Sequence, residues 1–261
     1  MAPSPPVSSD DGETKKREYQ MLFSLVVILL YMIMKSTWSM LPNAKSDIYD
    51  FLIIKMTRVW YKAVLDRLPG GARILDVGIG TATALVKPEN KEILERKNIV
   101  VVGIDYEKDY IDRAGERVAQ AGLADRVKLN CTSIYNPKLR SLFQGASRFD
   151  AIYFSGSLTL LPDPAAALKA TCAMLTDNGL IYVTQTFQNK KSPIAERVKP
   201  LLQRFTSIDF GKVTYFTEIH EIATKAGLKI LEDGPIPGSI DNSTQTARMI
   251  VMRPTSSSKR D

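Results

Sequence analysis

An apolar segment that runs directly into two closely spaced glycines constrains this chain more than any other feature. Residues 73–77 (RILDV) have the length and composition of a buried strand, and Gly78 and Gly80 follow at once. Glycine allows backbone conformations that other residues avoid, and it lets a ligand pass close to the main chain. In open parallel sheets, ligands bind at the carboxyl ends of the strands. The segment therefore predicts an α/β domain with a binding site above this strand.

The order of the remaining segments supports an α/β domain, because helical and strand-like patterns alternate along the chain. The expected helices are 48–68, 83–96, 107–121, 164–175 and 217–226. The expected strands are 73–77, 99–104, 126–130, 149–154, 180–184, 229–232 and 247–252. We expect Pro88 to disturb the middle of its helix, Thr217 to cap the last helix, and 177–179 (DNG) to form a turn before the fifth strand. The pattern places one folded domain at 42–253, followed by a polar tail at 254–261.

Composition excludes several classes of protein. The 261 residues are 44% hydrophobic and 24% charged, which argues against a mostly disordered, collagen-like or polytopic membrane chain. The formal net charge of +7 favours acidic partners such as nucleic acid or anionic lipid but identifies neither. Cys131, Cys172 and the single His220 share no metal-ligand spacing, so we predict no metal site and no disulfide framework.

The N-terminal region contains an uncharged apolar run at 21–34 (MLFSLVVILLYMIM). Extended to residue 41, just before Pro42, it nearly reaches the ~20 residues that a membrane-spanning helix needs. Lys35 and Trp38 stand where a snorkelling cation and an interfacial anchor are typical. We therefore predict a single membrane anchor helix at 21–41, preceded by a disordered polar tail at 1–20.

Two other interpretations of 21–41 stay open. The apolar core also suits a signal peptide, since Lys15, Lys16 and Arg17 precede it, although no small-x-small cleavage site follows. Alternatively, the helix packs on the folded domain or lies in the bilayer interface. Basic residues flank the run on both sides, so charge does not define its orientation.

A carboxylate follows the second expected strand. Asp105 comes after 99–104 (IVVVGI), and parallel strands place it beside the glycine turn, where it can accept two hydrogen bonds from a ribose diol. A dinucleotide site is disfavoured, because its fingerprint requires a third glycine where this chain has Thr83. These residues predict a nucleoside-containing ligand of another kind.

Taken together, several motifs resemble the class I methyltransferases that use S-adenosylmethionine, over about 49–252. The motifs are Asp76-x-Gly78-x-Gly80, Asp105, 149–152 (FDAI) and 175–180 (LTDNGL). The resemblance implies a Rossmann-like seven-stranded sheet with helices on both faces and a final antiparallel hairpin. It also implies that the cofactor lies over the ends of the first and second strands.

The resemblance further implies roles for individual residues. Asp76, Gly78 and Gly80 surround the methionine moiety of the cofactor, and Asp105 binds the ribose hydroxyls. Tyr106 flanks the adenine together with Ile104.

Two positions depart from the family pattern. Ala82 stands in place of the third glycine, and Ser133 or Thr132 stands in place of the acidic residue that faces the adenine amine. A hydroxyl accepts that hydrogen bond more weakly than a carboxylate does.

Residues 215–228, with Tyr49-Asp50, resemble small-molecule and lipid methyltransferases, including the quinone-biosynthesis and phospholipid N-methyltransferase groups. We therefore expect methyl transfer to a small-molecule or lipid-like acceptor at a membrane. Because the cofactor is made in the cytosol, we expect the catalytic domain on that side. The basic segment 187–213 is expected to cap the substrate site.

The catalytic residues remain undetermined. The candidates for a base are Tyr153, Ser155, Ser157 and His220, which the sequence does not rank. A protein or nucleic-acid methyltransferase is the alternative enzyme, although no Asn-Pro-Pro-Tyr-like motif follows the fourth strand. A catalytically silent membrane-tethered scaffold is the alternative outside the enzymes.

Overall fold

The computed structural model describes residues 44–139, 148–189 and 215–255, with side chains from residue 54 onward. The contacts discussed below lie within one compact unit, Tyr49–Asp261.

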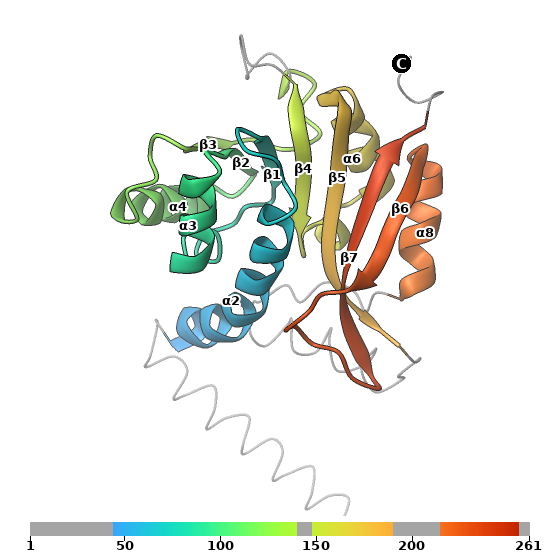
Figure 1. The fold of residues 1–261 in the computed structure, drawn as a ribbon, viewed down its shortest axis with the longest axis horizontal. Coiled ribbons are helices and arrows are strands. Elements are labelled where there is room, and N and C mark those ends of the chain that lie inside the picture. The colour runs from blue at the N-terminus through green and yellow to red at the C-terminus, as the bar shows by residue number, and fades with distance from the viewer. Residues whose placement is uncertain (1–43, 140–147, 190–214, 256–261) are drawn as a thin grey trace, which may run out of the picture. The chain divides into compact units, whose positions relative to one another are not determined.

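A seven-stranded sheet forms the centre of this unit, in the order β3-β2-β1-β4-β5-β7-β6 (Figure 1). The strands are β1 Arg73–Val77, β2 Val100–Asp105, β3 Val127–Cys131, β4 Phe149–Ser155, β5 Leu175–Gln188, β6 Leu228–Pro235 and β7 Gln245–Pro254. The first five run parallel, whereas β7 is antiparallel to both β5 and β6. The predicted sheet with its final antiparallel hairpin is confirmed.

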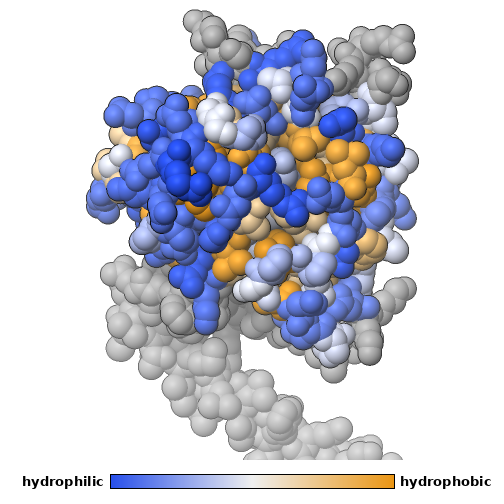
Figure 2. Space-filling view, viewed as in Figure 1, coloured by the Kyte–Doolittle hydropathy of each residue, from blue (hydrophilic) through white to orange (hydrophobic). Residues whose placement is uncertain are grey.

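Helices cover both faces of the sheet. The helices are α2 Ala44–Leu65, α3 Pro88–Arg96, α4 Lys108–Gln120, α6 Pro164–Cys172 and α8 Phe216–Lys225. Apolar side chains of α2, α3 and α4 join one buried cluster with one face of the sheet, and those of α6 and α8 join a second cluster with the other face. Hydrophilic side chains dominate the surface over α3 and α4, whereas hydrophobic side chains gather over the half formed by β5, β6 and β7 (Figure 2).

Three local predictions were wrong. Pro88 begins α3 instead of disturbing its middle, because the first turn of a helix needs no backbone donor from that residue. Thr217 lies inside the first turn of α8, after the N-cap residue Tyr215. Residues 177–179 belong to β5 and form no separate turn, and the pairing register with β4 shifts between Phe149 and Ala151.

The predicted membrane helix at 21–41 and the tail at 1–20 lie outside the described residues, as do residues 190–213 of the predicted cap. Among the residues that are described, no helix combines the length and the apolar character that a membrane crossing requires. The anchor stays a prediction from the sequence.

Candidate active site

The glycine loop after β1 folds against the end of β2. The backbone N–H groups of Gly78 and Ile79 both donate to the Ile104 carbonyl, at 2.8 and 3.1 Å. Gly80 N–H donates to Oδ2 of Asp105 at 3.0 Å. The structure therefore brings the predicted residues of both strand ends to one edge of the sheet.

The two glycines of this loop have different environments. Both have positive φ, 75° at Gly78 and 56° at Gly80, a conformation that L side chains rarely adopt. A Cβ atom on Gly78 would lie 2.6 Å from the Cβ of Ser157, whereas a Cβ on Gly80 would meet no atom within 4 Å. Gly78 therefore packs against the loop after β4, and Gly80 borders open space that a ligand can enter. Ala82, in place of the family's third glycine, also has positive φ, at 54°.

Asp105 has two functions available to it. Its Oδ1 accepts from the backbone N–H of Glu107 at 3.0 Å, and its Oδ2 accepts from Gly80, so the carboxylate holds the glycine loop. Burial raises the pKa of Asp105, and these backbone donors oppose that rise. A carboxylate has about four acceptor positions, so two remain for a ribose diol.

Asp76 is fully buried beneath the loop. The Tyr61 hydroxyl of α2 donates to Oδ2 at 2.7 Å, whereas Oδ1 has no hydrogen-bond partner among the described residues. The pKa of Asp76 is raised to about 7. Burial is the main cause, the nearby Asp105 adds to the rise, and the Tyr61 hydrogen bond opposes it. An unpaired buried carboxylate oxygen is costly, so this atom fits a site that a ligand donor completes.

Tyr61, which the sequence indicates as a packing residue, also contacts the predicted site residue Asp76. Its ring packs edge-on against Tyr153, with 5.0 Å between centroids and an interplanar angle of 89°. The Tyr153 hydroxyl in turn pairs with Oγ1 of Thr184 at 2.9 Å. Tyr61 lies on a helix face with apolar neighbours, so its pattern indicates packing, and only the fold shows its contact with Asp76.

The residues predicted to face the adenine lie at the same edge of the sheet. Tyr106 is 75% exposed at the end of β2, and Tyr110 is 44% exposed in the first turn of α4. Thr132 N–H donates to the Asp105 carbonyl at 2.8 Å, which brings the segment after β3 to the same edge. Ser133 Oγ accepts from the backbone of Tyr135 at 3.2 Å. Tyr110 was not predicted.

The four candidate bases lie in different environments. Ser157 donates to the Val77 carbonyl, and burial raises the pKa of Tyr153, so both are held as neutral hydroxyls. Ser155 Oγ is buried without a partner among the described residues. His220 lies on α8, where it contacts Asp233 of β6 at 3.3 Å, and its ring lies tilted by 59° against the ring of Phe216. Because β6 is the far edge strand, the fold does not bring His220 together with Asp76 and Asp105.

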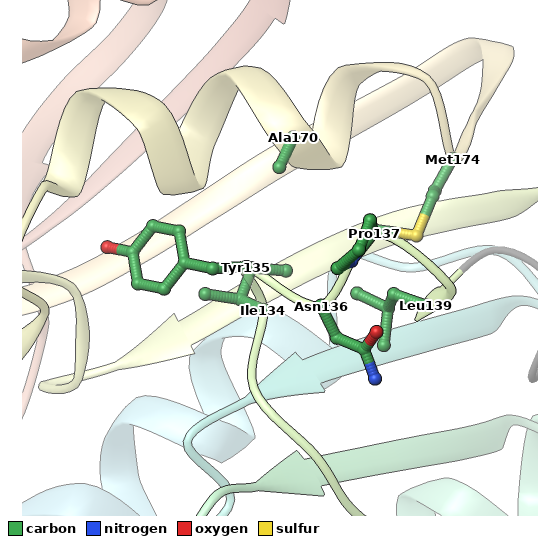
Figure 3. Close-up of a pocket in the computed structure, with 7 residues that line it drawn as sticks. All are labelled: Ile134, Tyr135, Asn136, Pro137, Leu139, Ala170 and Met174. Carbon is green, nitrogen blue, oxygen red and sulfur yellow. The ribbon is translucent and has the colours of Figure 1, made fainter.

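A separate apolar pocket of about 270 Å³ lies between the segment after β3 and α6 (Figure 3). Its lining residues are Ile134, Tyr135, Asn136, Pro137, Leu139, Ala170 and Met174. The Tyr135 hydroxyl donates a hydrogen bond to the Asp163 carbonyl and accepts one from the Asp163 N–H. The Asn136 side-chain amide donates to the Thr132 hydroxyl. The pocket includes none of the predicted cofactor residues, so it is not the candidate active site.

The fold and this edge define a class I methyltransferase, and comparison with known proteins agrees. Residues 69–227 match the family described as "Methyltransferase domain". The chain belongs to this family. The predicted enzyme class, an S-adenosylmethionine-dependent methyltransferase, is confirmed at this level.

Curated relatives share a quarter or more of the aligned residues. The chain is 25% identical to a phosphatidylethanolamine N-methyltransferase of Cereibacter sphaeroides over 195 residues, which are 74% of this chain and 89% of that protein. It is 28% identical to a ubiquinone biosynthesis O-methyltransferase of Psychrobacter arcticus over 162 residues, which are 60% of this chain and 59% of that protein.

Solved structures show the same fold. A SAM-dependent methyltransferase of Geobacter sulfurreducens, solved in complex with S-adenosylhomocysteine, superposes with a TM-score of 0.51 at 16% identity. The superposition covers 76% of this chain and 90% of that one.

Proposed function

We propose that this enzyme transfers the methyl group of S-adenosylmethionine to a small-molecule or lipid-like acceptor at a membrane. One observation supports the choice of cofactor. Gly80, which borders open space, lies next to the Asp105 carboxylate, which has acceptor positions left for a ligand. The similarity to the phosphatidylethanolamine and ubiquinone biosynthesis enzymes supports the acceptor class.

The proposed roles of the residues follow from their positions. Asp105 binds the ribose hydroxyls with its two remaining acceptor positions, and Tyr106 offers an exposed ring to the adenine. Gly78 and Gly80 let the main chain pass beneath the methionine part, which Asp76 faces from below. Ser133 offers a hydroxyl at the adenine edge.

When bound, the cofactor would supply an electrophilic methyl group: the acceptor would attack the methyl carbon in line with the C–S bond, and the sulfonium sulfur would depart with that electron pair as a neutral thioether. The protein therefore has to orient the acceptor and exclude water more than to move protons. Among the described residues, the side chains at the carboxyl ends of β4 and β5 are uncharged. They include Ser155 at the end of β4, Thr159 in the turn after it, and Thr184, Gln185 and Thr186 in the second half of β5. The Thr186 hydroxyl contacts the sulfur of Met56 at 3.5 Å. Among the described residues, these strand ends therefore offer hydroxyl and amide groups to an acceptor.

The membrane part of the proposal rests on the sequence of 21–41. An apolar run of that length anchors a domain at the bilayer, and the catalytic unit is expected on the cytosolic side, where the cofactor is made. The excess of Lys and Arg over Asp and Glu, 35 to 28, suits an anionic lipid surface.

The test is a methyl-transfer assay with radiolabelled S-adenosylmethionine on total lipid extract, small-metabolite extract and RNA. Label in lipid or metabolite supports the proposal, and label confined to RNA or protein contradicts it. Binding of S-adenosylhomocysteine is measured in parallel by calorimetry.

Gly80→Val is the matched inactive variant. A β-branched side chain fills the open space beside the loop and disfavours its positive φ, so cofactor binding is expected to fall below detection. Circular dichroism checks that the variant is folded. A folded Gly80→Val protein that binds S-adenosylhomocysteine normally would show that the loop does not line the cofactor site.

A further inference from the structure

A cluster of polar and aromatic side chains lies where β5, β6 and β7 meet α8. β5 and β6 both run antiparallel to β7, so the ends of β5 and β6 and the start of β7 share one edge of the sheet. The cofactor loop lies at the same edge, because β5 runs parallel to β4 and β4 runs parallel to β1. The members of the cluster are Arg248 on β7, Asp233 on β6, Gln185 on β5, and Phe216 and His220 on α8.

Arg248 is held at one side of its guanidinium group and is open at the other. Its Nε donates to Oδ1 of Asp233 at 2.7 Å, and Nη2 donates to the Asp233 carbonyl at 3.2 Å. The group lies over the Phe216 ring, 4.9 Å from the ring centroid. A guanidinium has five N–H donors, so three of them, including both on Nη1, donate to no described residue. The side chain is 25% exposed, which leaves the cluster open to a ligand.

Gln185 places a second donor beside Arg248. The two residues are direct partners in the β5–β7 ladder, so their side chains leave the same face of the sheet with Cβ atoms about 4.5–5.5 Å apart. The side-chain oxygen of Gln185 accepts from Oγ1 of Thr159 at 3.4 Å, and its Nε2 donates to no described residue. Guanidinium and amide donors that lie side by side match the oxygens of a phosphate or a carboxylate.

We propose that Arg248 and Gln185 form a subsite for an oxyanion, a phosphate or a carboxylate, that the methyl acceptor carries. The inference rests on the proposed function and adds to it a chemical group that the acceptor contains. In the sheet, β7 lies two strand spacings from β4, or roughly 10 Å. The oxyanion is therefore a recognition group, several bonds away from an atom that is methylated above the end of β4.

Asp233 and two aromatic rings fix Arg248 before a ligand binds. The Asp233 side chain is only 11% exposed, and it contacts Nε2 of His220 at 3.3 Å as well as Arg248. Phe216 packs edge-on against the buried Phe187, with 6.2 Å between centroids, so the ring under the guanidinium is itself supported. Arg248 balances the charge of Asp233, so the pair does not repel an anion. Donors that are already fixed lose little side-chain entropy when they bind.

The experiment is calorimetry on the full chain in micelles of a neutral detergent, saturated with S-adenosylhomocysteine. Two probes are free anions, glycerol 3-phosphate and glycerate. Two are lipid-borne anions, dioleoylphosphatidic acid and oleate in the same micelles. We expect at least one of these probes to bind at a single site. The pair that binds more tightly indicates the source of the oxyanion, a soluble metabolite or a lipid.

Three variants test which residues hold the probe. Arg248→Met removes the guanidinium donors and is expected to weaken binding about tenfold or more. Gln185→Leu removes the amide without touching Asp233 or Phe216 and is expected to weaken binding about three- to tenfold. Arg253→Met is the matched control, because Arg253 is an exposed arginine of β7 that lies five residues away, on the opposite face of the sheet. It removes the same charge and is expected to change affinity by less than about twofold.

The outcomes separate the subsite from the proposed function. If S-adenosylhomocysteine binds and no anion does, the subsite is refuted while the proposed function stands. Unchanged affinity in Arg248→Met, or an equal loss in Arg253→Met, also refutes it. Arg248-dependent binding without methyl transfer to lipid or metabolite extract supports the subsite and refutes the proposed function. If circular dichroism shows that Arg248→Met is unfolded, Gln185→Leu decides, and unchanged affinity in that variant refutes the subsite.

Discussion

At the residue scale, the burial of Asp76 beneath the cofactor loop makes the stability of the folded protein depend on pH. Its pKa in the folded protein, about 7, lies above the ordinary value of 3.8 for an aspartate, so the folded state binds the proton more tightly than the unfolded chain does. The associated stability is therefore fully present below about pH 4 and is lost as the pH rises to about 7.

Asp76→Asn removes this titration while keeping an acceptor for Tyr61. Without ligand, we compare the free energy of unfolding of the variant with that of the unmodified protein. We expect this difference to be about 3 kcal/mol more favourable to the variant at pH 8 than at pH 5, because about two units of pKa contribute ~1.4 kcal/mol each. Urea unfolding at both pH values measures this difference. Asp66→Asn, at an exposed carboxylate, is the control. An equal effect of Asp76→Asn at the two pH values would contradict the buried, protonated state.

Asp105 is both a ligand position and a support for the glycine loop, so the choice of variant matters. Asp105→Asn keeps one acceptor oxygen for the loop but loses the charge, and we expect S-adenosylhomocysteine affinity to fall roughly ten- to a hundredfold. Asp105→Ala also leaves Gly80 N–H and Glu107 N–H unpaired, so we expect an additional loss of stability of about 1–3 kcal/mol. Calorimetry and urea unfolding separate the two effects. Unchanged affinity in folded Asp105→Asn would contradict the ribose assignment.

The sequence predicted the positions that local strand and loop patterns determine, and it missed the contact that depends on packing between distant segments. Asp76, Gly80 and Asp105 follow from local rules, because parallel strands bring their carboxyl ends to one edge. Tyr61 reaches Asp76 from a different element, and no local pattern distinguishes it from a packing residue. The roles assigned to the cofactor residues stay predictions, since the structure places these side chains but carries no ligand.

At the element scale, the loops after β1 and β4 are fitted to each other through Gly78 and Ser157. Gly78→Ala introduces a Cβ at 2.6 Å from the Cβ of Ser157 and keeps a positive φ that costs about 1–2 kcal/mol. We expect a loss of stability of at least about 2 kcal/mol.

Ser157→Gly in the same chain removes the opposing atom, so the double variant is expected to recover about 1 kcal/mol of that loss. The strain from φ and the lost hydrogen bond to Val77 remain. A double-mutant cycle by urea unfolding measures the coupling between the two positions. Strict additivity would show that the loops do not contact each other in solution.

The elements themselves were largely predictable, and the exceptions have physical causes. All seven strands were expected within a few residues, because buried strands are bounded by turn residues and alternate with amphipathic helices. The helix expected at 83–96 begins only at Pro88, since the segment before it contains Ala82 in a left-handed conformation. Leu175, expected to end α6, instead begins β5, because an apolar residue at such a boundary suits either element.

At the scale of the whole molecule, the cofactor residues and the apolar N-terminal run are separate in sequence. Every proposed cofactor contact, from Asp76 to Ser133, comes after residue 54, and the family match begins at residue 69. The run at 21–41 contributes nothing that aligns methyl, sulfur and acceptor. The two regions are therefore expected to respond independently to deletion.

A chain that begins at Asn43 is expected to bind S-adenosylhomocysteine with the affinity of the full chain and to lose association with zwitterionic lipid vesicles, which do not attract its positive charge, in a flotation assay. The physical reason is that the apolar run supplies most of the free energy of insertion, at roughly 25 cal/mol per Å² of buried apolar surface. The full chain in the same assay is the control. Flotation of the shortened chain would contradict an anchor at 21–41, and its failure to fold would assign that segment to the core. In sealed vesicles that hold the full chain, added protease is expected to digest the catalytic unit, and protection of that unit would reverse the proposed orientation.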